Sequence, residues 1–375
     1  MIYLDSAATS FLKPPETARA VTGAMARFAS PGRGIYGPAM DAAETVYRCR
    51  ETAASLFHLP DPTRVVFTMN ATHGLNVAIR SVVRSGMRVL VSGYEHNAVV
   101  RPLAALGAEM LIVDTPPFDT QAFLCGFEKK LDKADAVVVT HVSNVFGFIL
   151  PVREISALCG KRGIPWILDA AQSAGSLPVD FTALGAEFIA MPGHKGLLGP
   201  QGTGLLLCRG DAEPLLYGGT GSMSDSLSMP ESLPDRLEAG TQNVCGIAGL
   251  LAGMEYVQRR GVDQIRAREG RLSRTLIREL EQLGTLRVIS GPEQNQAGVL
   301  SVIPVRGSCE ELASRLWEQG VAVRSGLHCA PLAHETAGTK KTGTVRLSVS
   351  PFNTEAEIYE TVRIIKKIMQ NNYIL

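Results

Sequence analysis

The chain has 375 residues, of which 45% are hydrophobic and 19% are charged, with a formal net charge of +1. This length exceeds what one hydrophobic core usually organises, so we expect a large domain and a smaller one. The balanced charge gives no electrostatic reason to expect nucleic acid or a membrane as partner. Seven scattered cysteines without a CxxC pair favour a reduced, cytoplasmic protein over a disulfide framework or a zinc ribbon. The N-terminus has an acid at position 5 and no long apolar core, so we do not expect export.

Helix-like and strand-like segments alternate between about residues 42 and 208. The pattern predicts helices at 41–57, 71–83 and 151–163, and strands at 64–68, 88–93, 135–143, 165–169 and 186–193. Strands of continuous Val, Ile and Leu separated by helices are typical of a mainly parallel sheet that is covered on both faces. We therefore expect a doubly wound α/β domain.

The character of the sequence changes after residue 210. Residues 218–243 are rich in Gly, Ser and Pro and predict a long, functional loop. The pattern then predicts helices at 246–261 and 262–283, a strand at 297–305, a helix at 309–320, strands at 321–326 and 343–350, and a helix at 354–372. We expect a large α/β domain over residues 1–260 and a small C-terminal α+β domain over 261–375, with residues 1–40 able to pack on the small domain.

Polar clusters follow five of the predicted strands, and in such sheets ligands bind beyond the carboxyl ends of the strands. The clusters are "TMNATHG", "SGYEHN", "THVSNVFG", "LDAAQS" and "MPGHKG". Core packing explains a single cluster of this kind but hardly the whole series. The sequence therefore predicts a ligand site at this rim.

Lys195 lies between apolar runs, which predicts that it is enclosed. Burial lowers the pKa of an ammonium group and favours the neutral amine that forms a Schiff base with a carbonyl. An ion pair or a snorkelling lysine is the structural alternative. Asp169, at the end of "WILD", needs a cationic partner if it is buried, although a helix cap or a salt bridge also explains it. A lysine Schiff base with an aspartate facing a pyridinium nitrogen is the arrangement that pyridoxal phosphate (PLP) requires.

Other polar side chains at this rim fit the rest of that cofactor. Thr72 lies at a strand-to-helix turn whose free N–H groups can hold a phosphate, or it simply caps the helix. His194 offers a second phosphate contact. His96 is a candidate for stacking on the ring, or a structural histidine, and Asn144 and Gln172 can hydrogen-bond the ring oxygen.

The predicted small domain contributes a thiol and a guanidinium. Cys329 lies beside His328 and five residues after Arg324, a basic environment that favours thiolate, although it can also be a packed cysteine like the other six. Arg346, on a predicted strand, offers a fork for an amino-acid carboxylate. We expect no metal at His328, Cys329 and His334, since their spacing is not a familiar zinc pattern.

Nine motifs occur together in the order found in one family. They are "YLDSAATS", "ATHGLN", "YEHNA", "HVSNVFG", "LDAAQSAG", "PGHKGLLGPQGTG", "LEAGTQNVCGIAGL", "RSGLHCAP" and "GTVRLSVSPFNT". From residue 2 to 365 the chain resembles class V aminotransferase-fold PLP enzymes, which have PLP-dependent transferase fold type I. It most resembles the cysteine desulfurases and selenocysteine lyases with the short-loop, type II active site.

The resemblance implies a role for each site residue. It implies that Lys195, Cys329 and His96 are catalytic, that Thr72, His73, His96, Asn144, Asp169, Gln172, His194, Lys195 and Thr241 bind the cofactor, and that Arg346 and Asn144 bind the substrate. Thr241 matches a phosphate contact that the partner subunit supplies in the family, which implies a homodimer. Pro192 and Leu327 depart from the serine and the histidine that relatives often have at these positions.

The implied reaction converts L-cysteine to L-alanine and leaves the sulfur on Cys329 as a persulfide. A selenocysteine lyase, or another PLP-dependent lyase or aminotransferase of this fold, is the nearest alternative. A non-catalytic sulfur-relay or scaffold homologue is a further one, although it has no reason to keep Lys195, Asp169 and Arg346. A nucleotide-binding oxidoreductase is disfavoured because no GxGxxG follows the first strand. A sulfur-acceptor protein is a possible partner that no residue identifies.

Overall fold

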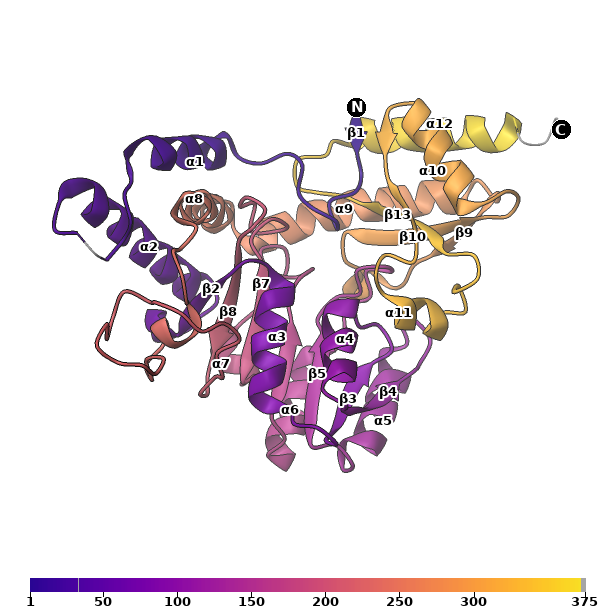
Figure 1. Cartoon of the computed structure of the whole chain (residues 1–375). Coiled ribbons are helices and arrows are strands. Elements are labelled where there is room, and N and C mark those ends of the chain that lie inside the picture. Colours follow the sequence, from indigo (N-terminus) through magenta and orange to yellow (C-terminus); the bar gives the residue numbers. More distant parts are fainter. Residues whose placement is uncertain (33, 372–375) are drawn as a thin grey trace.

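The computed structural model describes residues 1–32 and 34–371. Its strands form a seven-stranded sheet, a four-stranded sheet and a two-stranded pair (Figure 1). The large sheet has the order β2-β8-β7-β6-β5-β3-β4, with strands at Val65–Thr68, Gly204–Cys208, Phe188–Pro192, Trp166–Asp169, Ala136–Thr140, Arg88–Ser92 and Glu109–Val113. All of them run in one direction except β8, which is antiparallel to both of its neighbours. The predicted large, mainly parallel sheet is confirmed.

Helices cover both faces of the large sheet, because successive residues of its strands point to opposite sides. Val138 packs with α3 and α4 on one face, whereas Val137 and Val139 pack with α2, α5, α6 and α8 on the other. The helices of this part are α1 (Pro15–Arg27), α2 (Gly37–Leu56), α3 (Ala71–Val82), α4 (Asn97–Ala105), α5 (Thr120–Leu131), α6 (Val152–Arg162), α7 (Phe181–Leu184) and α8 (Val244–Arg260). Figure 1 shows α3 and α4 in front of the sheet.

The small sheet is antiparallel throughout and has the order β12-β13-β10-β9. Its strands are Arg324–Gly326, Thr344–Ser348, Val299–Pro304 and Leu286–Ile289. One face packs its aliphatic side chains against α9 (Val262–Glu281), α10 (Cys309–Glu318) and α12 (Glu355–Asn371). The opposite face carries Ser301 and Arg346, which are directly paired and point toward the large sheet. The small sheet therefore presents polar groups to the carboxyl ends of the large one.

The N-terminal chain crosses between the two sheets. Strand β1 (Ile2–Tyr3) pairs in parallel with β11 (Val321–Ala322), near the other end of the chain. It does not join the large sheet, whose first strand is β2. We propose a domain boundary at Gly261, whose positive φ of 81° ends α8 and starts α9.

The structure differs from the sequence prediction in several elements. The strand predicted at 321–326 is wrong: it is two strands, β11 and β12, because the chain changes sheets at Val323. The sequence prediction also omits several described elements: β1, α1, β4, α4, α5, α7 and β8 within residues 1–260, and β9 and α11 (Pro331–Thr336) within residues 261–371. The predicted loop at 218–243 has no strand and only one short 3₁₀ turn, at Asp235–Leu237.

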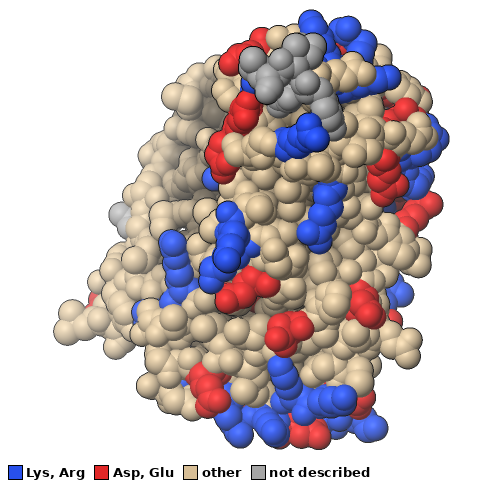
Figure 2. Space-filling view, turned by 90° about the vertical axis from the view of Figure 1, so that its right-hand side faces the viewer, with Lys and Arg blue, Asp and Glu red and all other residues tan. Residues whose placement is uncertain are grey.

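Charges are mixed on the surface. Acidic and basic side chains are interspersed over the face in Figure 2, in keeping with a formal net charge of +1. None of the described helices is both long and apolar enough to cross a bilayer.

Candidate active site

A cavity of about 190 Å³ opens at the carboxyl ends of the large-sheet strands. Its lining includes Thr72, His96, Asn144, Asp169, Gln172, His194 and Lys195, together with Ala8, Asn70 and Pro192. Each of the first seven follows or ends one of the strands β2, β3, β5, β6 and β7. Parallel strands bring these chain-distant side chains to one place, as the sequence predicts.

Lys195 lies in a tight turn after β7. The turn packs so closely on the loop after β6 that a Cβ on Gly175, where φ is +86°, would lie 2.3 Å from the Gly196 carbonyl oxygen. Burial lowers the pKa of Lys195 to about 8; Asp169 opposes this effect, and the positive charge of Arg346 adds to it. The amine can therefore gain and lose a proton close to neutral pH.

Asp169 ends β6 and is buried. Its Oδ1 accepts a hydrogen bond of 2.8 Å from the Ala171 N–H. Burial raises the pKa of the Asp169 carboxyl, while this hydrogen bond and Lys195 act in the other direction. A cationic ring nitrogen in the cavity would stabilise the carboxylate further.

His96 is both a cavity residue and the N-cap of α4. Its Nδ1 accepts a hydrogen bond of 3.0 Å from the Ala98 N–H, so the proton of the neutral ring is on Nε2. Burial, followed by the charge of Lys195, lowers the pKa of His96 to about 4. The ring is therefore neutral at physiological pH, which suits stacking on a heteroaromatic ring.

The N-terminus of α3 opens into the cavity. Asn70, rather than Thr72, caps this helix by accepting from the His73 N–H at 2.9 Å. Thr72 is exposed, and its hydroxyl has no hydrogen-bond partner in the part of the chain described here. The helix N-terminus and this hydroxyl form a suitable phosphate anchor. His194 lies across the cavity, where its Nδ1 is 3.0 Å from the Thr9 hydroxyl.

Two predicted cofactor ligands lie elsewhere. His73 and the exposed Thr241 line a neighbouring cavity of about 210 Å³, together with Met69, Leu216 and Glu238. His73 uses its Nδ1 to accept from the Met69 N–H at 3.3 Å. Within one chain, neither residue lines the Lys195 cavity.

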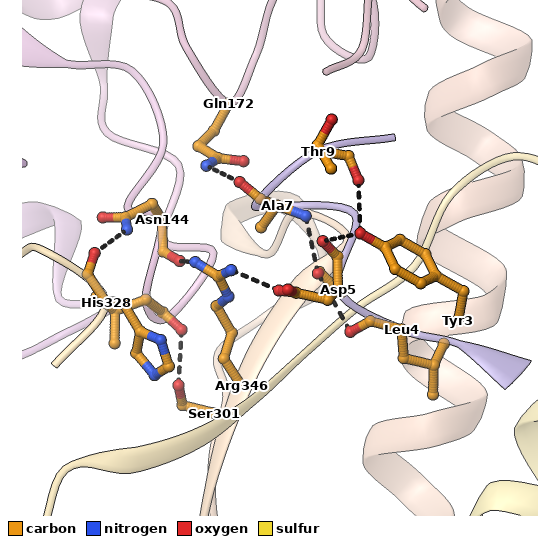
Figure 3. A network of polar contacts seen from close by, with 12 residues as sticks. Tyr3, Leu4, Asp5, Ala7, Thr9, Asn144, Gln172, Ser301, His328 and Arg346 are labelled. Carbon is orange, nitrogen blue, oxygen red and sulfur yellow. Dashed lines mark hydrogen bonds and ion pairs between the residues drawn. The ribbon is translucent and has the colours of Figure 1, made fainter. Parts of the chain in front are cut away.

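The predicted substrate residues form one network (Figure 3). The Asn144 Nδ2 donates to the His328 carbonyl oxygen at 2.8 Å, and the Asn144 carbonyl oxygen accepts from Arg346 at 3.0 Å. The Asn144 Oδ1 is buried and has no partner among the described residues. Gln172 donates to the Ala7 carbonyl oxygen at 3.0 Å. Arg346 is 2% exposed.

Cys329 is exposed on a loop held to the cavity at two points. The Asn97 N–H donates to the Cys329 carbonyl oxygen at 2.8 Å, and Asn144 binds the preceding carbonyl. His328 and Cys329 have φ of 50° and 56°, a left-handed conformation that costs non-glycine residues roughly 1–2 kcal/mol each. The backbone of this loop is therefore fixed against Asn144, which lines the cavity.

The expected basic environment of Cys329 is only partly present. His328 is buried and faces Thr344, and burial with the charge of Arg346 lowers its pKa to about 2. The ring is neutral and contributes no positive charge to the thiol. The exposed Arg324 remains on the neighbouring strand β12. The expectation that the other cysteines are packed is wrong for Cys125, which is exposed.

The Aminotransferase class-V model matches residues 2–360. The chain belongs to the class-V aminotransferase family. It is 33% identical over 370 residues to a "Probable cysteine desulfurase" of Methanothermobacter thermautotrophicus, covering 95% of this chain and 92% of the relative. It is 32% identical to a "Cysteine desulfurase" of Escherichia coli O157:H7, covering 98% and 93%.

Solved structures agree with this family assignment. A cysteine desulfurase from Thermococcus onnurineus, described as an apo structure, has a TM-score of 0.91 and 30% identity, covering 99% of this chain and 95% of that one. A cysteine desulfurase of Escherichia coli has a TM-score of 0.85 and 25% identity, covering 98% and 94%. The class-V fold is thus PLP-dependent transferase fold type I, as the sequence predicts.

The cavity of this class-V chain fits PLP. Asp169 offers a buried carboxylate for a pyridinium nitrogen, Lys195 an amine for the aldehyde, and α3 an anchor for the phosphate. The unpartnered Asn144 Oδ1 also needs a donor. Among residues 1–32 and 34–371, the cavity included, no cluster of three or more His, Cys, Asp or Glu side chains is placed to hold a metal ion.

Two residues at the site were missed from the sequence. Asp5 forms an ion pair of 2.7 Å with Arg346. Glu95 is fully buried between β3 and β5, where its Oε1 accepts from the Thr140 N–H at 3.0 Å, and burial raises the pKa of its carboxyl to about 8. Glu95 stands beside His96 in "YEHN", but Asp5 lies almost 200 residues before Lys195 and no local pattern connects them.

Proposed function

We propose that this protein is a PLP-dependent cysteine desulfurase that converts L-cysteine to L-alanine and takes the sulfur onto Cys329. The main support is that Lys195, Asp169, His96 and Asn144 line one cavity of a class-V chain whose relatives are cysteine desulfurases. Pyridoxal phosphate, when bound, supplies the electron sink for charge that develops on the substrate carbon atoms.

The side chains of the site divide the remaining work. Lys195 would hold the cofactor, and its amine, whose pKa is lowered by burial, would move the proton of the substrate Cα. When PLP is bound, Asp169 would keep its ring nitrogen protonated, and neutral His96 would contact its ring. Arg346 binds the substrate carboxylate.

Cys329 completes the reaction as nucleophile. Its thiolate attacks the substrate sulfur, so that an S–S bond forms and the Cβ–S bond breaks. The electron pair of the broken bond stays with the substrate carbon, which gains a proton and becomes the methyl group of L-alanine. The persulfide on Cys329 then passes its outer sulfur to an acceptor, for which a protein is one candidate.

A single turnover of the PLP-loaded protein with L-cysteine, without reductant, tests this function. We expect one L-alanine per subunit and an extra sulfur on the alkylated Cys329 peptide by mass spectrometry. Cys329→Ala should release less than about a hundredth of the L-alanine. Alanine at the parent rate from that variant would instead indicate lyase chemistry, which is the expectation for a selenocysteine lyase.

We further propose a homodimer that lends Thr241 to the partner's cofactor site. Large apolar side chains are exposed on and beside α2 and close to the loop that carries Thr241, which supports their burial against a second copy of the chain. They include Tyr36, Met40, Met69 and Tyr217. The 218–243 loop that carries Thr241 contacts α2 through an ion pair of 2.6 Å between Glu238 and Arg50. Light scattering of the purified protein should give about twice the chain mass, and a monomer at micromolar concentration would contradict the proposal.

We also propose the cytoplasm as its compartment. A thiol that forms a persulfide must return to the reduced state after each turnover, and a reducing compartment maintains it.

A further inference from the structure

The N-terminal segment Tyr3–Ser10 runs from the two-stranded pair of β1 and β11 to the Lys195 cavity. The Leu4 N–H donates to the Ala322 carbonyl oxygen at 2.9 Å, and Ala8 already lines the cavity. The Ser10 N–H donates to the His194 carbonyl oxygen at 3.0 Å. This segment therefore belongs to the site, although it precedes every strand of the large sheet.

Hydrogen bonds to the backbone of this segment fix the position of Asp5. The Tyr3 hydroxyl donates to the carbonyl oxygens of Asp5, at 3.1 Å, and of Thr9, at 2.9 Å. The Ala7 N–H donates to the Ser348 hydroxyl at 2.9 Å, on the strand that carries Arg346. The Asp5 carboxylate is thus a fixed partner, and Figure 3 shows it facing the guanidinium.

The guanidinium of Arg346 is only partly used by the protein. One terminal nitrogen donates to Asp5 at 2.7 Å and the other to the Asn144 carbonyl oxygen at 3.0 Å. Each terminal nitrogen of an arginine has two N–H groups, so one remains on each for a bidentate carboxylate. Asn144, whose carbonyl oxygen accepts from Arg346, itself lines the Lys195 cavity, so the guanidinium lies directly behind the cavity wall.

A second arginine stands beside this one. Arg324 on β12 is the direct cross-strand partner of Arg346 on β13, so both side chains lie on the same face of the sheet. Two like charges in this position repel each other unless a counter-ion is present. Asp5 neutralises one of the two positive charges and leaves one for an incoming anion.

We propose that Asp5 is a resident counter-ion that shares Arg346 with the α-carboxylate of the amino acid and thereby weakens the binding of that carboxylate. This inference rests on the proposed function, in which Arg346 binds the substrate carboxylate. The weakening favours release of L-alanine after each turnover. If the ion pair were purely structural, removal of the Asp5 charge would instead weaken the binding of L-alanine, because the site would become less ordered for every ligand.

The test compares two ligands that differ only in the carboxylate, L-alanine and ethylamine. Dissociation constants are measured by calorimetry on the PLP-loaded wild type and on Asp5→Asn, whose amide oxygen still accepts the Arg346 hydrogen bond. Two carboxylates sharing one guanidinium repel each other, so we expect L-alanine to bind roughly tenfold tighter to Asp5→Asn. Ethylamine affinity should change less than about twofold. Asp5→Glu, which keeps the charge, is the matched control and should stay close to wild type.

Arg346→Met separates failure of this inference from failure of the proposed function. One outcome is that Arg346→Met lowers the affinity for L-alanine while Asp5→Asn leaves that affinity unchanged or lowers it. In that case the counter-ion role of Asp5 is wrong and the proposed function stands. If Arg346→Met leaves L-alanine affinity unchanged, Arg346 does not bind the carboxylate, and the Asp5 inference fails together with the proposed role of Arg346. The single turnover with L-cysteine then decides the proposed function separately. Should Asp5→Asn unfold, a comparison of Asp5→Glu with Asp5→Ser gives the same decision.

Discussion

Lys195 should destabilise the cofactor-free protein, because its ammonium is enclosed. Burial lowers its pKa from 10.5 to about 8. At about 1.4 kcal/mol per pH unit, the protonated lysine costs the folded state roughly 3 kcal/mol relative to the unfolded chain. Between pH 8 and 10.5 the unfolded chain binds more protons than the folded one, so this destabilisation is complete below pH 8 and disappears as the pH rises toward 10.5.

The destabilisation by Lys195 is tested by urea unfolding of the cofactor-free wild type and of Lys195→Met at pH 7 and pH 9.5. The variant should be more stable than wild type at pH 7, and its advantage should shrink by about 2 kcal/mol at pH 9.5. Any packing difference between the side chains is the same at both pH values and cancels in the comparison. Lys366→Met, on the exposed side of α12, is the control and should show no such pH dependence. An equal effect of Lys195→Met at both pH values would refute the lowered pKa.

Two further predictions concern packing around the site. Arg50→Met leaves the buried Glu238 carboxylate without its two guanidinium bonds, so the free energy of unfolding from urea titration should fall by about 3–5 kcal/mol. Arg363→Met, in an exposed pair, should cost less than about 1 kcal/mol, and equal losses would contradict the argument. Gly175→Ala puts a Cβ against the Gly196 carbonyl and strains a positive φ, so PLP should dissociate more readily in dialysis while the circular dichroism spectrum stays native. Unchanged PLP retention would show that the lysine turn tolerates displacement.

Local sequence was sufficient for the residues that follow strands. Lys195, Asp169, His96 and Asn144 each stand next to a continuous apolar run, and parallel strands necessarily bring their carboxyl ends to one edge. The five strands β2, β3, β5, β6 and β7, and the cavity at their carboxyl ends, could therefore be predicted without coordinates. The direction of β8 could not be predicted, because an apolar run has the same appearance whichever way the strand runs.

The tertiary structure alone decided the charges around Arg346 and Cys329. His328 precedes the cysteine in sequence and was expected to supply positive charge, but its ring is turned into the core toward Thr344, and burial keeps it neutral. Asp5 is separated from Arg346 by 341 positions, and only the docking of the N-terminal segment on β13 makes them an ion pair. Burial and long-range pairing set these charges, and neither is encoded in the spacing of neighbouring residues.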